Sequence, residues 1–95
     1  MSATITVKRA GEDADPLVLD VLVRDGMGET RHRVTLPCGE ARRLTGGRNV
    51  EELVAAAFRF LLDREPKEAI LARFEFSVIA GYFPEFETRL PDYFD

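Results

Sequence analysis

Cys38 and His32 are the side chains best suited to nucleophilic chemistry, because a thiol beside an imidazole base is a common catalytic pair. Cys38 stands in LPCGEARR, just before a possible helical turn, where a thiol can become reactive. Pro37 separates it from His32, and six extended residues would hold the two about 20 Å apart. We therefore expect Cys38 to be a small buried or half-buried residue and His32 to be a solvated strand residue.

Metal-binding and phosphate-binding motifs are not found in the sequence. One histidine and one cysteine cannot form a closed zinc site, and the acids show no calcium-loop or H-E-x-x-H spacing. Gly46 and Gly47 precede a predicted helix, as in phosphate loops, but Glu51 and Glu52 occupy the first turn where a phosphate would lie. We expect no catalytic residues, no cofactor and no bound metal, and we interpret the chain as a non-enzyme.

An arginine-rich stretch is the next candidate for chemistry, since guanidinium groups bind phosphates. It consists of Arg31, Arg33, Arg42, Arg43 and Arg48. A solvated face of mixed charge is the simpler interpretation, because residues 1–62 hold nine acids and nine bases. Nucleic-acid binding is kept as the alternative function and ranked below protein binding.

The composition predicts one soluble domain spanning residues 1–95. Hydrophobic residues make up 45% and charged residues 32% of the chain, as in ordinary globular proteins. No apolar run is long enough for a membrane span, and the N-terminal residues lack the apolar stretch of a secretory signal. With a single cysteine, no internal disulfide can form. We expect a cytoplasmic protein, and the excess of arginine over lysine suggests a bacterial source.

The predicted fold class is α+β. Alternating apolar residues indicate strands at 3–9, 17–24 and 30–36, which we expect to form a three-stranded antiparallel meander. A short helical turn at 39–44 should end at Gly46 and Gly47. A long amphipathic helix follows from Val50 to Leu62, capped by Asn49, with its apolar stripe facing the sheet. Its stripe consists of Val50, Leu53, Val54, Ala57, Phe58, Leu61 and Leu62.

Short C-terminal helices are expected after this one. Pro66 is well placed to begin a helix that runs to Phe74, and Ser77 can cap a turn before Pro84. Alternation over residues 74–82 also fits a fourth strand. We favour short helices there, because prolines and a capping serine surround the segment.

The C-terminal aromatic cluster is the strongest candidate for an interaction surface. Seven of the nine aromatic residues lie within residues 74–95, and that region also carries the acidic excess of a chain whose net charge is −4. Most of these rings are needed for the core or for the second face of the sheet, around Val18 and Leu22. The outer ones form the candidate surface: Tyr82, Phe86, Tyr93 and Phe94. The expected partner is another copy of the chain or an unidentified protein.

Residues 58–86 carry a specific pattern: a helix, then R-E-P-K-E-x-I-L, then F-x-x-S-V-I-x-x-Y-F-P-E with a final aromatic. This segment resembles the C-terminal half of a group of small uncharacterised bacterial proteins. The resemblance implies a class and no mechanism. The sequence therefore predicts a non-catalytic protein-interaction or regulatory module that self-associates through its aromatic C-terminal segment.

Overall fold

A computed structural model describes residues 3–11 and 14–94 of the chain, and Met1, Ser2, Glu12, Asp13 and Asp95 lie outside the described residues. The predicted α+β class and the antiparallel meander are confirmed. The strands are β1 (Thr4–Arg9), β2 (Leu17–Asp25), β3 (Gly28–Leu36) and β4 (Arg73–Glu75), in the order β1-β2-β3-β4. β4 is parallel to β3, which adds an edge strand to the predicted sheet.

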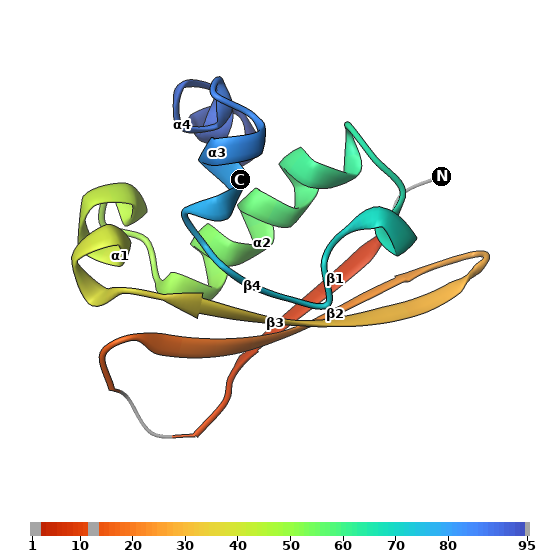
Figure 1. Ribbon diagram of the computed structural model, residues 1–95, viewed down its shortest axis with the longest axis horizontal. Coiled ribbons are helices and arrows are strands. Elements are labelled where there is room, and N and C mark those ends of the chain that lie inside the picture. Colours follow the sequence, from red (N-terminus) through yellow and green to blue (C-terminus); the bar gives the residue numbers. More distant parts are fainter. Residues whose placement is uncertain (1–2, 12–13, 95) are drawn as a thin grey trace.

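The helices lie on one side of this sheet, as Figure 1 shows. They are α1 (Cys38–Thr45), α2 (Val50–Leu62), α3 (Val78–Tyr82) and α4 (Phe86–Arg89), with 3-10 turns η1 (Lys67–Ala69) and η2 (Leu90–Tyr93). Helix α2 crosses the sheet, and α3 and α4 lie beyond it. The predicted stop after α1 is confirmed, because Gly46 caps α1 with φ 59°, a left-handed conformation that suits glycine.

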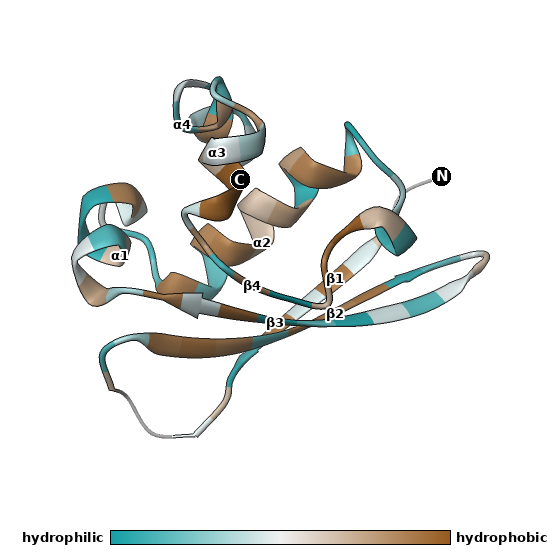
Figure 2. Ribbon diagram, viewed as in Figure 1, coloured by the Kyte–Doolittle hydropathy of each residue, from teal (hydrophilic) through white to brown (hydrophobic). Residues whose placement is uncertain are grey.

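The face of β2 toward α2 is built from every second residue. Leu17, Leu19, Val21 and Val23 are buried, as the alternation predicts. Val34 and Leu36 extend this apolar surface onto β3. Figure 2 shows α2 and the strand stretches beneath it as mostly hydrophobic, whereas β3 near the β2–β3 turn is mostly hydrophilic.

Helix α2 has the predicted bounds and the predicted cap. The Asn49 side chain accepts a hydrogen bond from the Glu52 N–H at 2.8 Å, which satisfies one of the unpaired donors at the helix start. The centre of the stripe, from Leu53 to Leu61, is buried. Phe60 lies outside the stripe yet is fully buried, because the C-terminal segment covers this other side of the helix.

The predicted helix from Pro66 to Phe74 is wrong. Only the short turn η1 forms, and Ile70 is extended with φ −75° and ψ 133°. The chain then pairs with β3: the Arg33 N–H donates to the Ala72 carbonyl at 2.7 Å, and the Phe76 N–H donates to the Thr35 carbonyl at 2.8 Å. Pairing with the sheet therefore overrides local helix propensity in this segment.

Both interpretations of residues 74–82 hold in part: the segment begins in a short strand and ends in a helix. Strand β4 ends at Glu75, and α3 begins at Val78. Ser77 precedes α3, but its side chain makes no capping bond to the helix. Instead its N–H and its hydroxyl both donate to the Glu75 carboxylate, which tightens the turn between strand and helix.

His32 is buried, which corrects the expectation of a solvated residue. Its Nδ1 lies 2.8 Å from the Leu71 carbonyl oxygen, which can only accept, so Nδ1 donates there. Nε2 is 2.8 Å from the Thr30 hydroxyl, and the ring centroid is 5.3 Å from that of Phe58. His32 thus fixes the chain just before β4, and both of its ring nitrogens have partners.

The opposite face of the sheet stays open in the described part of the chain. Val18 and Leu22 are half-buried there, and the C-terminal segment packs on α2 instead of covering them. The expectation that some of the C-terminal rings cover the second face of the sheet is therefore wrong.

Lys67 is a buried cation that ties η1 to the β2–β3 turn. Its ammonium group lies 2.9 Å from Asp25 Oδ1 and 2.6 Å from Glu68 Oε2, with the lysine side chain only 2% exposed. Hydrogen bonds to Glu68 and then to Asp25 raise the pKa of Lys67. The bond from Lys67 lowers the pKa of each of the two carboxyls.

A Lys67→Met variant should therefore change how stability depends on pH. The carboxyls have lowered folded pKa values, so their contribution is complete above the ordinary values of 3.8 and 4.5 and is lost as the pH falls through the folded ones. The Lys67 contribution is lost as the pH rises past 10.5 through its raised folded value.

Thermal denaturation across pH measures this effect. The Tm difference between wild type and Lys67→Met should favour the wild type most between about pH 5 and 9 and less on either side. Lys8→Met is the control, since Lys8 has no ion pair with any described residue. A Tm difference for Lys67→Met that stays constant from about pH 3 to 7 would contradict the role of the buried ion pairs.

Candidate interaction surface

The four predicted surface residues do not lie on one surface. Tyr82 is 71% exposed, whereas Phe86 is 1% exposed and belongs to the core. Tyr93 and Phe94 are half-buried and pack against the core. The prediction that Phe86 is an outer residue is therefore wrong, because its ring fills the space between α2 and the C-terminal segment.

Phe60 of α2 is the centre of this aromatic packing. Its ring centroid lies 5.0 Å from that of Phe86 and 5.7 Å from those of Phe83 and Tyr93, all with edge-to-face geometry. Phe86 in turn contacts Phe76 at 5.6 Å. Most of the C-terminal aromatics are therefore used to hold the segment on α2.

Arg64 covers the ring of Phe60 at the edge of this aromatic cluster. Its guanidinium carbon lies 3.6 Å from the Phe60 ring centroid, a cation–π contact. The same group donates to the Tyr93 hydroxyl and to the Glu85 carboxylate, each at 3.4 Å, and these bonds raise the pKa of Arg64. The Tyr93 hydroxyl donates to Asp63 at 2.5 Å, so the polar group of Tyr93 is bonded within its own domain.

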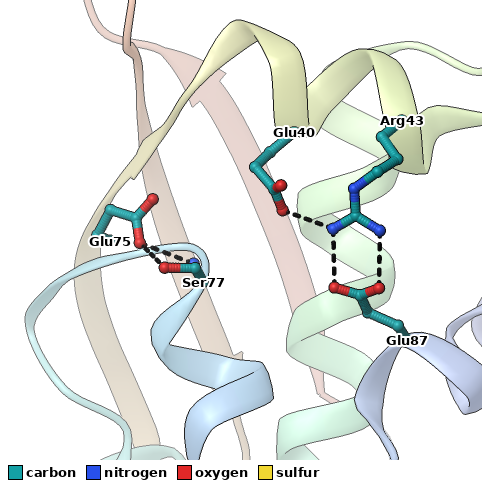
Figure 3. Close-up of polar contacts among 5 residues, drawn as sticks. All are labelled: Glu40, Arg43, Glu75, Ser77 and Glu87. Carbon is teal, nitrogen blue, oxygen red and sulfur yellow. Dashed lines mark hydrogen bonds and ion pairs between the residues drawn. The ribbon is translucent and has the colours of Figure 1, made fainter.

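A second ionic contact joins α1 to α4, as Figure 3 shows. Arg43 binds both carboxylate oxygens of Glu87 at 2.8 and 2.9 Å and also binds Glu40 at 2.8 Å. The Arg43 hydrogen bond lowers the pKa of Glu87, and Glu87 and then Glu40 raise the pKa of Arg43. Such a bidentate pair is stronger than a single exposed ion pair, so it helps to fix α4 in place.

The predicted arginine-rich surface is divided among three places. Arg31 and Arg33 lie on the open face of the sheet, where Arg33 binds Asp20 at 2.8 and 3.1 Å. Arg42 and Arg43 lie on α1. The Arg48 guanidinium carbon is 4.2 Å from the Phe94 ring centroid, so this arginine covers an aromatic side chain.

Cys38 and His32 form no catalytic pair in the described structure. The half-buried thiol of Cys38 lies 3.6 Å from the Ala14 carbonyl, and its N–H donates to Asp15 at 3.1 Å. The nitrogens of His32 are bonded elsewhere. Within residues 3–11 and 14–94, no three His, Cys, Asp or Glu side chains gather where they could hold a metal ion.

An apolar groove lies between the end of α2, η1, β4 and α3, with a volume of about 280 Å³. Leu71 and Tyr82 are at its rim, 49% and 71% exposed, and with Met27 they are the most exposed large apolar side chains of the described residues. We call this surface the C-terminal groove. Its lining consists of Leu61, Glu65, Ala69, Ile70, Leu71, Phe74, Val78, Ile79, Tyr82 and Phe83.

Sequence reasoning identified Tyr82 but missed Leu71. The sequence predicts a helix from Pro66 to Phe74 over Leu71, and the exposure of Leu71 follows from the extended chain that replaces that helix. The only sequence signal was the alternation after Phe74, which was ranked second.

Comparison with known proteins leaves the chain without a family assignment. No protein-family model, curated protein or solved structure matches it. The resemblance of residues 58–86 therefore stays a prediction. Among the described helices, none combines the length and the apolar character needed to cross a membrane.

Two substitutions distinguish core from surface in this region. Phe86→Ala should lower the free energy of unfolding by about 3–5 kcal/mol, because it leaves a cavity beside Phe60. Tyr82→Ala should change it by less than about 0.5 kcal/mol. Denaturant unfolding at low protein concentration measures both, and equal effects of the two substitutions would contradict these positions.

Proposed function

We propose that this protein is a non-catalytic interaction module that self-associates through the C-terminal groove. The observation that carries the proposal is the exposure of Leu71 and Tyr82 at the rim of an apolar groove. Exposed apolar side chains that adjoin a groove are typical of protein-binding surfaces. We place the protein in the bacterial cytoplasm, in keeping with its composition.

A second copy is the occupant that we propose for the groove. Glu65 is the only charged residue of the groove lining, so two acidic chains can meet there with little repulsion. The groove also adjoins β4, an edge strand of the sheet, and a two-fold related copy can cover both features with the same surface.

Nucleic-acid binding ranks second. Four of its five arginines have intramolecular partners: Arg31 binds Glu29, Arg33 binds Asp20, Arg43 binds Glu87, and Arg48 covers Phe94. To bind a phosphate, each of these arginines would have to break its intramolecular contact or bind both partners at once. The net charge of −4 adds long-range repulsion.

The mass in solution tests self-association. Sedimentation or light scattering over increasing concentration should show a dimer of the wild type, and Leu71→Ser or Tyr82→Ser should weaken it at least about tenfold. Met27→Ser is the matched control, because Met27 is 87% exposed at the β2–β3 turn, away from the groove. A monomeric wild type, or equal association of all three variants, would overturn the proposal.

A further inference from the structure

Strand β4 presents an unpaired backbone edge. In a parallel pair, alternate residues bond to the neighbouring strand. The bonds of the Ala72 carbonyl and the Phe76 N–H to β3 show that even-numbered residues face β3. The N–H and C=O groups of Arg73 and Glu75 therefore point outward, and no described residue bonds to them. In Figure 1, β4 forms the near edge of the sheet.

The side chains on this edge carry opposite charges. Arg73 makes no ion pair with any described residue, and its neighbour across the sheet is another cation, Arg33. Glu75 has Ser77 as its hydrogen-bond partner. Arg73 and Glu75 point to the open face of the sheet, while Phe74 between them lines the C-terminal groove.

We propose that a second copy adds its β4 to this edge, antiparallel, about a two-fold axis through Phe74. This arrangement rests on the proposed self-association and specifies which residues of the two β4 strands lie opposite each other. Arg73 of each copy then lies opposite Glu75 of the other, and each pair exchanges two backbone hydrogen bonds. The two sheets become one continuous sheet, and the two grooves adjoin at the axis.

The charges select this register. An axis through Arg73 would place Arg73 opposite its own copy, and an axis through Glu75 would place two carboxylates opposite each other. Only the axis through Phe74 pairs opposite charges on a short strand of sequence RFE.

The other edge of the sheet is less suited to pairing with itself. Strand β1 carries Lys8 and Arg9 and no acid, so no register of two β1 strands places opposite charges across from each other. The edge of β4 is thus the one whose charges are complementary to a second copy.

Charge reversal tests the register directly. Arg73→Glu places two acids opposite two acids, and Glu75→Arg places bases opposite bases, so each variant alone should associate at least about tenfold more weakly than the wild type. An equal mixture of the two variants should recover dimers, because every cross-strand pair is then of opposite charge. The double variant Arg73→Glu/Glu75→Arg should also dimerise.

Controls separate this geometry from the self-association on which it rests. Lys8→Glu reverses a charge on the same open face, on β1 at the opposite edge of the sheet, and should associate like the wild type. Thermal melts confirm that each variant is folded. If Leu71→Ser and Tyr82→Ser dissociate the dimer but the single reversals do not, or the mixture fails to recover, the β4 pairing is overturned and self-association stands. A monomeric wild type overturns both.

Discussion

The burial of α2 on two sides is the constraint on which the rest of the structure depends. One side packs on the sheet through residues such as Val54 and Phe58, and the other side receives Phe60 into the C-terminal aromatics. A fully buried phenylalanine contributes about 2–3 kcal/mol. The segment after α2 is held mainly by this packing, with Arg64 and Arg43 adding directional contacts at its margins.

This arrangement explains why the C-terminal segment forms an edge strand and does not pack on the open face of the sheet. With Phe86 packed against Phe60 and Phe76 packed against Phe86, the chain between η1 and α3 passes beside β3. His32 holds the Leu71 carbonyl at that point, and Lys67 holds η1 to the turn of the hairpin. The exposed side chains of the groove are therefore positioned by buried polar contacts that hold the chain just before β4.

The sequence predicted the elements whose periodicity is long and clear. Alternation over β2 and the spacing from Val50 to Leu62 allow one interpretation each, and both were confirmed. Residues 66–74 fit a helix and residues 74–82 fit helix and strand alike. The structure of both stretches depends on pairing with β3, which no local pattern reveals.

Contacts between residues remote in sequence also explain why the candidate surface was predicted only in part. Phe86 and Tyr82 have similar local surroundings in sequence, and only the position of Phe60, off the apolar stripe of α2, indicated that a second layer of apolar residues had to cover this helix. His32 was misplaced because its partner Leu71 is remote in sequence.

The parallel pairing of β4 with β3 also makes the outward edge of β4 a property of the finished fold. β3 and β4 are remote in the sequence, so the edge forms only where the C-terminal segment has returned to the sheet. A chain in which this pairing has not formed does not present the edge. Recognition through this edge would therefore discriminate between chains with a docked and an undocked C-terminal segment.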